Sequence, residues 1–302
     1  MRIAVTGSSG FIGRHVTSFL AARGDEVVPV RRPFARASLV DTLRGAEAVV
    51  HLAGVVSALR DRELFEANVD GTRAVASAAR SVGARLIHIS SLAAAGPASP
   101  IAPRLEDDPP APITAYGRSK LEGEHAIAAI DGLRWTILRP GVVYGPGDRA
   151  LLPLFTFALR GVMPLVGRGG AAYTFIHVTD LVRAIAAAID RPADRDTIFV
   201  GHPTPVPPRE LLEHVRSAVG RPAVILKVPS ALLRIAALAG DIGGTLRGKP
   251  LPINSRRYAE MSCEGFVCQV DRLRDHLGVV AGIDLREGIA ETAAWYRQEG
   301  WL

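Results

Sequence analysis

Tyr116 and Lys120 lie four positions apart in the segment 116–120, which reads Tyr-Gly-Arg-Ser-Lys. Four residues make about one turn of an α-helix, so the phenol and the ammonium would point to the same side of a helix. A cation close to a phenol stabilises the phenolate and lowers its pKa, which makes a tyrosine usable as a general acid or base. The pair therefore predicts proton transfer, with a surface pair that has no catalytic role as the alternative.

Two serines, Ser90 and Ser91, stand where an apolar segment that we interpret as a strand comes to its end. Open α/β sheets bind their ligands at the carboxyl ends of parallel strands. A hydroxyl at that edge can hydrogen-bond the oxygen of a substrate while Tyr116 exchanges its proton. Together with Lys120, these residues predict a Ser-Tyr-Lys catalytic set.

A glycine-rich segment, 7–13, reads Gly-Ser-Ser-Gly-Phe-Ile-Gly and lies between a short apolar strand and a segment with helical spacing. In such a loop one glycine allows a tight turn, one lets the backbone approach a pyrophosphate, and one lets helix and strand pack closely. The N-terminus of the next helix offers N–H groups and a positive dipole end to the phosphates. The segment therefore predicts a dinucleotide site. Its expected contacts are Gly7, Ser9, Gly10, Phe11, Ile12 and Gly13.

Two arginines, Arg31 and Arg32, follow the second expected strand, 26–30, and no acidic residue stands there. An Asp or Glu at this point would bond the adenosine ribose hydroxyls and repel a 2′-phosphate, whereas guanidinium groups attract phosphate. The pair favours NADP(H), with NAD(H) as the second cofactor to consider. Two solvated surface arginines are the alternative interpretation.

Expected strands and helices alternate through the first two-thirds of the chain, which indicates βαβ units and a parallel sheet. We therefore predict an α/β fold, a Rossmann-type doubly wound parallel sheet with a smaller, mostly helical C-terminal substrate-binding cap. The dinucleotide-binding domain is expected at 1–150, with 177–201 returning to it, and the cap at 151–176 and 202–302. The expected strands are 3–6, 26–30, 48–52, 85–90, 135–138 and 198–201, and the expected helices are 11–22, 63–82, 116–130 and 181–189.

Composition narrows the classes of protein. The chain has 302 residues, 48% of them hydrophobic and 22% charged, so a sizeable core can form. Its net charge of +6 comes mostly from scattered arginines without a basic tract, so nucleic acid is not expected as a partner. No cluster of histidine, cysteine and acidic residues has metal-ligand spacing, and no metal site is predicted.

The sequence also suggests a cytoplasmic protein. The first residues lead directly into an apolar strand without a signal peptide, and two cysteines, Cys263 and Cys268, fit a reducing compartment. No run of about 18 uncharged apolar residues predicts a membrane span. The most apolar stretch, 228–242, contains Arg234 and Asp241 and is interpreted as a helix against the core or beside an apolar pocket.

Seven segments together resemble the extended short-chain dehydrogenase/reductase family, which includes NAD(P)-dependent epimerase/dehydratase and 3β-hydroxysteroid-dehydrogenase-like proteins. The match runs almost from end to end, and its order and spacing are specific. The segments are GSSGFIG from Gly7, HLAG from His51, NVDGT from Asn68, HISSLAAAG from His88, YGRSK from Tyr116, LRPGVVYGPGD from Leu138 and TFIHVTDLVRAI from Thr174.

The resemblance implies a role for each matched residue. Counting back from Gly96, the resemblance implies that Ser91 is the catalytic serine, with Ser90 as the alternative. It also implies that Tyr116 is the acid/base and that Lys120 contacts the nicotinamide ribose. A homodimer through the helices 63–82 and 116–130 is also implied. Further implied cofactor contacts are Leu52, Ala53, Gly54, Asn68, Ser90, Tyr116, Lys120, Pro140 and Val143.

One departure from the family concerns the short segment 33–47. Relatives are expected to carry more residues here, including a strand that ends near the adenine. We therefore expect this strand to be shortened or missing, with Asp41 as a substitute contact.

The resemblance leaves several reactions open, so the substrate is judged from the pocket segments. Tyr173 stands where similar sugar epimerases carry an arginine, and no acidic residue follows Ser91 as a dehydratase would need. Apolar segments instead suggest a hydrophobic small molecule, contacted by Leu92, Ala93, Val142 and Tyr173. We predict hydride transfer to or from the carbonyl or secondary alcohol of such a molecule. The alternatives are a nucleotide-sugar 4-epimerase with bound NAD and a non-catalytic dinucleotide-binding protein.

Overall fold

The computed structural model describes residues 1–34, 36–191 and 194–302. A six-stranded sheet in the order β10-β5-β4-β3-β1-β2 forms the centre of the larger part, and all its neighbouring strands are parallel. This confirms the predicted Rossmann-type sheet. Its strands are β1 (Arg2–Thr6), β2 (Glu26–Val30), β3 (Ala48–His51), β4 (Arg85–Ile89), β5 (Trp135–Pro140) and β10 (Asp196–Val200).

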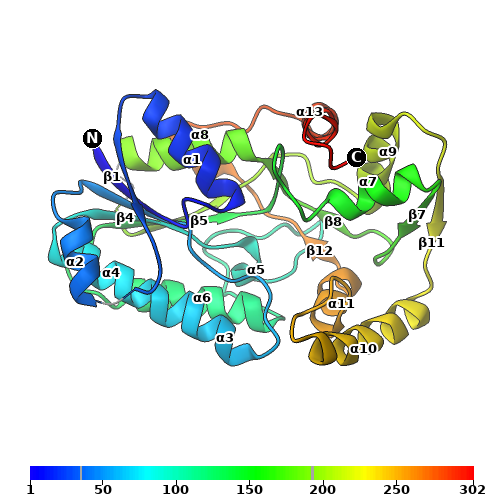
Figure 1. Cartoon of the computed structure of the whole chain (residues 1–302), viewed down its shortest axis with the longest axis horizontal. Helices are drawn as coiled ribbons and strands as arrows, with labels where there is room; N and C mark the ends of the chain where they lie inside the picture. Colours follow the sequence, from blue (N-terminus) through cyan, green and yellow to red (C-terminus); the bar gives the residue numbers. More distant parts are fainter. Residues whose placement is uncertain (35, 192–193) are drawn as a thin grey trace.

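Helices cover both faces of this sheet (Figure 1), which explains why the central strands are buried on both sides. On one face lie α1 (Phe11–Ala22) and α8 (Val178–Asp190), whose apolar residues share a core with β1. The other face is covered by α2 (Arg36–Leu43), α4 (Gly71–Ser81) and α6 (Ala115–Ala128). The predicted helix 63–82 consists of α3 (Asp61–Phe65), a π-helical turn η1 (Glu66–Asp70) and α4.

The short segment between β2 and β3 has the expected consequence. Among its described residues the chain forms α2 and no strand, so β2 is the edge strand of the sheet. We expected the third strand of the usual order to be shortened or missing, and among the described residues it is missing. Too few residues separate β2 from β3 to build a helix, a strand and their connections.

The smaller part lies to the right in Figure 1 and has its own core around Phe155, Met163, Leu212 and Tyr296. Three two-stranded sheets, β11-β7, β12-β8 and β6-β9, accompany its helices. Its elements are β6 (Val142–Tyr144), α7 (Leu152–Leu159), β7 (Val162–Leu165), β8 (Ala172–Tyr173), β9 (Phe175–His177), α9 (Pro208–Val219), β11 (Val224–Lys227), α10 (Ser230–Arg247), α11 (Ser255–Ser262), β12 (Gly265–Phe266) and α13 (Leu285–Gln298). Two further short helices, α5 (Leu92–Ala95) and α12 (Asp271–Leu277), pack against elements of the larger part.

Two helices of the C-terminal third add detail to the sequence-based picture. Leu273 and Leu277 of α12 belong to the core beside α8, so part of the segment 202–302 packs against the Rossmann sheet. In α10, Leu233 is buried whereas Ile235 is exposed, so the expectation that the segment 228–242 packs on a core holds for one side of the helix. Within the described ranges, no helix is long and apolar enough to cross a membrane.

Candidate active site

A cavity of about 560 Å³ lies where β3, β4 and β5 end, between the sheet and the smaller part. Apolar side chains from both parts make up most of its lining, as in sites for hydrophobic ligands. The structure brings fifteen of the predicted site residues together along this cavity. They are Phe11, Ile12, Leu52, Gly54, Asn68, Ser90, Ser91, Leu92, Ala93, Tyr116, Lys120, Pro140, Val142, Val143 and Tyr173.

Tyr116 lies in the first turn of α6, where the Thr114 side chain caps the helix by accepting from the Gly117 N–H at 3.2 Å. A Cβ at Gly117 would come within 2.4 Å of the Ala93 carbonyl oxygen, so glycine is needed for this end of α6 to reach α5. Burial raises the pKa of the Tyr116 phenol, and a hydrogen bond with Ser91 opposes this shift. The phenol is therefore protonated at neutral pH.

Lys120 lies one turn further along α6 and is fully buried. Its Nζ donates to the Ile89 carbonyl oxygen at 2.7 Å. Burial lowers the pKa of Lys120 to about 8, although the nearby Glu124 carboxylate favours the charged form. The expected lowering of the Tyr116 pKa by Lys120 is not found, because Lys120 is not among the groups that shift this pKa and burial of the phenol raises it.

The hydroxyls of Ser90 and Ser91 have different partners. Ser91 Oγ accepts from the Ala93 N–H at 3.2 Å, which caps α5, and it bonds the Tyr116 phenol. Ser90 Oγ donates to the buried Glu124 carboxylate, which also pairs with Arg139 at 2.6 Å. Both serines line the cavity, but only the Ser91 hydroxyl bonds the phenol.

The glycine-rich loop has the geometry of a phosphate cradle. Gly7 has φ +69°, and a Cβ at Gly13 would come within 2.0 Å of the Gly7 carbonyl oxygen. The N-terminus of α1 has no side-chain cap, so its first N–H groups and positive dipole end are open to an anion. These features fit the pyrophosphate of a dinucleotide.

Further along the expected path of the dinucleotide, Gly54, Asn68 and Lys120 meet at one point. A Cβ at Gly54 would lie 3.1 Å from Asn68 Oδ1 and 3.8 Å from Lys120 Nζ, so a small residue keeps this space open. Asn68 is held by bonds to both backbone groups of Val55 and to Ser119 Oγ. The Ala53 N–H bonds the Thr6 hydroxyl at 3.1 Å.

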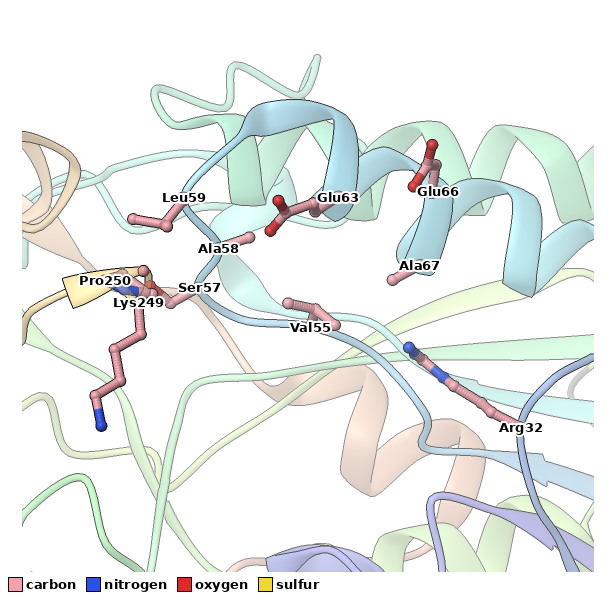
Figure 2. A pocket seen from close by; sticks show the side chains of 11 residues that line it. Arg32, Val55, Ser57, Ala58, Leu59, Glu63, Glu66, Ala67, Lys249 and Pro250 are labelled. Atoms are coloured by element: carbon pink, nitrogen blue, oxygen red, sulfur yellow. The ribbon is translucent and has the colours of Figure 1, made fainter. Parts of the chain in front are cut away.

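A second cavity of about 480 Å³ lies beside α3 and η1 (Figure 2). Figure 2 shows Arg32 at one end and Lys249 at the other, with Glu63 and Glu66 on the helical side. Arg31 is exposed and lines neither cavity. The expected substitute contact Asp41 is also outside both cavities, because it is exposed on α2 and pairs with Arg44 at 2.7 Å.

Sequence reasoning missed a charged pair that faces Tyr116. Arg257 and Glu260 of α11 line the main cavity and are 3.2 Å apart, and both act electrostatically on Tyr116. Burial raises the pKa of Glu260, which also bonds Thr114. An arginine and an acid three residues apart occur on many surface helices, so their spacing gave no usable signal.

The histidines in strand segments are packing and capping residues. His51 bonds Thr6 at 2.7 Å and Thr72 at 3.1 Å, and its ring stacks on that of His88. Burial lowers the pKa of His51 to about 3, so its ring is neutral. His177 Nδ1 caps α8 by accepting from the Thr179 N–H.

Comparison with known proteins identifies the class. The family model for the NAD dependent epimerase/dehydratase family matches residues 3–201, and the chain belongs to this family. It is an NAD(P)-dependent oxidoreductase/epimerase of the extended short-chain dehydrogenase type, a class whose members typically bind an NAD(P) dinucleotide.

Similar proteins carry names of different activities. A ceramide reductase of Caulobacter vibrioides is 29% identical over 325 residues, covering 99% of this chain and 96% of that protein. Sterol demethylase protein B of Methylococcus capsulatus is 28% identical over 341 residues, covering all of both chains. The solved structure of MoeE5 in complex with UDP-glucuronic acid and NAD has a TM-score of 0.78 at 26% identity, covering 99% of this chain and 100% of that one.

Proposed function

We propose that this protein transfers a hydride between NADP(H) and the carbonyl or secondary alcohol of a largely apolar small molecule. One observation carries the proposal: the partly buried phenol of Tyr116 bonds Ser91 at the wall of a cavity whose other lining is mostly apolar. Similarity over the whole chain to a ceramide reductase supports a reduction on a lipid-like substrate.

In the direction of reduction, a nicotinamide held beside Tyr116 and Lys120 would supply the hydride for the carbonyl carbon. Ser91 hydrogen-bonds the carbonyl oxygen and polarises it, and Tyr116 donates its proton to that oxygen, so the product is an alcohol. The raised pKa of Tyr116 supports this direction, because the phenol then carries the proton that it must give. Lys120 holds the nicotinamide ribose and keeps a positive charge near the site.

The proposed cofactor site extends from the catalytic residues to the glycine-rich loop. The open N-terminus of α1 would hold the pyrophosphate, and Arg31 and Arg32 would meet a 2′-phosphate. Arg32 lines the cavity beside α3 and η1, and its guanidinium is proposed to meet the 2′-phosphate of NADP(H) there. The proposed contacts are Gly7, Ser9, Gly10, Phe11, Ile12, Gly13, Arg31, Arg32, Leu52, Ala53, Gly54, Asn68, Ser90, Tyr116, Lys120, Pro140 and Val143.

The proposed substrate contacts are Leu92, Ala93, Val142 and Tyr173, which all line the main cavity. Arg257 and Glu260 join them as a polar pair at the cavity wall. We also propose that the chain forms a homodimer through α3, α4 and α6 and that it is located in the cytoplasm. The proposed domains are a dinucleotide-binding domain (1–150 and 177–201) and a cap (151–176 and 202–302).

A nucleotide-sugar 4-epimerase with bound NAD is the second candidate, favoured by the similarity to MoeE5 in complex with UDP-glucuronic acid and NAD. A diphosphate needs unpaired cations, and the one arginine among the residues that line the main cavity, Arg257, pairs with the Glu260 carboxylate. This pairing supports the apolar substrate. A protein that binds the dinucleotide without catalysis is the third candidate.

Thermal-shift and turnover assays on the whole chain separate the three candidates. We expect NADPH to raise Tm more than NADH does, and NADPH to be oxidised when hydrophobic ketones are added. Stabilisation by UDP-sugars, with interconversion of their 4-epimers, would favour the epimerase. Tight cofactor binding without turnover of any carbonyl would favour the non-catalytic protein.

A further inference from the structure

Helix α10 carries apolar residues on two opposite sides. Leu233 and Ala237 are buried, and a Cβ at Gly240 would come within 1.8 Å of the Ile253 carbonyl oxygen, so this side lies flat on the chain that follows. At 3.6 residues per turn, the exposed large residues fall on the opposite side. These residues, which we call the outer stripe, are Leu232, Ile235, Leu238, Ile242 and Leu246, and they are 54–83% exposed.

The outer stripe is longer than a chance cluster of single apolar residues. From Leu232 to Leu246 it extends about 21 Å along the helix, at 1.5 Å per residue. Val224 and Leu226, on the strand that leads into the helix, are exposed as well. Exposed apolar residues in such a continuous row mark an interaction surface.

The charges around the outer stripe identify its partner. Lys227, Arg234, Arg247 and Lys249 are exposed, and none of them forms an ion pair with another residue in the described ranges. Between 224 and 256 the sequence has a single acid, Asp241, and this carboxylate accepts from Ser255. An apolar helix face beside unpaired cations is the pattern of helices that lie in the surface of an anionic bilayer.

We propose that the outer stripe docks α10 in the plane of a membrane surface rich in anionic phospholipid. A second copy of the chain fits this face less well, because a two-fold interface would bring the same unpaired cations of both copies together. The inference does not rest on the proposed reaction.

The position of α10 also gives docking a consequence for the cavity. Helix α10 packs against α11 (Figure 1), and Arg257, Glu260 and Met261 of α11 line the main cavity. When α10 is docked, only α11 would separate the main cavity from the helix that lies in the lipid surface. An apolar substrate dissolved in the bilayer would have a short path to the site.

Co-sedimentation of the whole chain with vesicles tests the proposal. The wild-type protein should bind vesicles of phosphatidylcholine with phosphatidylglycerol, bind pure phosphatidylcholine vesicles less, and lose binding as salt is raised. The double variant Ile235→Glu, Ile242→Glu should bind about tenfold less or weaker still. The double variant Arg234→Gln, Arg247→Gln should bind the anionic vesicles with an affinity about fivefold lower for each charge removed. Its binding to pure phosphatidylcholine vesicles should not change.

Two controls keep the test decisive. Ile101→Glu changes a residue that is 95% exposed outside the stripe, and it should bind vesicles as the wild type does. The Tm of each variant, and its increase when NADPH is added, show whether the variant is folded. The proposal is overturned if the wild-type protein does not bind vesicles, or if the double variant Ile235→Glu, Ile242→Glu binds them equally well. It is also overturned if the wild-type protein is a dimer in solution, the double variant is a monomer, and neither binds vesicles. A protein that binds vesicles without reducing any ketone would contradict the proposed function and leave this inference standing.

Discussion

At the scale of single residues, Ser90 and Ser91 show how one position in the chain separates two roles. The Ser90 hydroxyl is bonded to Glu124 within a buried network, whereas the Ser91 hydroxyl bonds the Tyr116 phenol at the cavity. The sequence placed both at the end of a strand, and only the resemblance to a family favoured Ser91 for the catalytic role. Their different partners depend on the tertiary structure, which brings Glu124 to the first hydroxyl and Tyr116 to the second.

This difference predicts that replacing Ser91 with alanine mainly lowers activity, whereas replacing Ser90 with alanine mainly lowers stability. Ser91→Ala should lower kcat by about a hundredfold, because the substrate oxygen loses a hydrogen-bond donor. It should lower the free energy of unfolding by only about 1 kcal/mol, because its structural bond caps the short helix α5. Ser90→Ala should instead lower the free energy of unfolding by about 1–3 kcal/mol, because it removes a buried bond to a carboxylate. Steady-state kinetics and urea denaturation of the two variants check this, and interchanged effects would make Ser90 the catalytic serine.

Lys120 predicts the pH dependence of the reaction. Burial lowers its pKa to about 8, so the ammonium is present below this pH and is lost as the pH rises through it. The rate of reduction should therefore fall above pH 8. Lys120→Arg keeps the charge at alkaline pH and should move this fall to higher pH, which a pH profile of kcat/KM measures. A wild-type rate that stays constant through this range would show that the charge on Lys120 is not needed.

Arg31 and Arg32 predict the choice of cofactor. Replacing both with alanine should raise KM for NADPH by about 10- to 100-fold and change KM for NADH little, because only NADPH carries the 2′-phosphate. The single variants show which guanidinium binds it; Arg32 lines the cavity beside α3 and Arg31 does not. Equal effects on both cofactors would argue that the arginines are surface residues.

At the scale of elements, the first βαβ unit follows from its sequence. The apolar strand, the glycine-rich loop and the helix 11–22 are local patterns, and the structure has β1 and α1 at these places. Helix α10 was harder to predict, because a helix with apolar residues on two sides resembles a helix buried all round. Arg257 and Glu260 escaped prediction because their closeness to Tyr116 depends on where the fold places α11, which no local pattern encodes.

Gly13 provides a test at this scale. In Gly13→Ala the new Cβ would meet the Gly7 carbonyl oxygen at 2.0 Å, so α1 must shift away from the loop. We expect the free energy of unfolding to fall by about 1–3 kcal/mol and NADPH binding to weaken at least about tenfold. Urea denaturation and fluorescence titration measure the two effects. Gly169→Ala, where a Cβ meets no atom within 4 Å, is the matched control and should behave as the wild type does.

At the scale of the whole molecule, the main cavity combines segments that are far apart in the sequence. The Rossmann sheet supplies Ser91, Tyr116 and Lys120, and the smaller part supplies Tyr173 and the Arg257–Glu260 pair. Arg256 connects the two parts, since its guanidinium bonds the Ala58 carbonyl oxygen at 2.5 Å and the Asp61 carboxylate. Resemblance to a family anticipated the first group, and the apolar pocket segments of the sequence anticipated Tyr173, but the Arg257–Glu260 pair emerged only from the folded chain.

The proposed reaction depends most on proton transfer by Tyr116, and the rate of the Tyr116→Phe variant tests this transfer directly. With NADPH and the best hydrophobic ketone from the screen, this variant should bind the cofactor as the wild type does. Its kcat should be lower by about a hundredfold or more, because the ring remains while the proton donor is lost. A kcat equal to that of the wild type would contradict the mechanism.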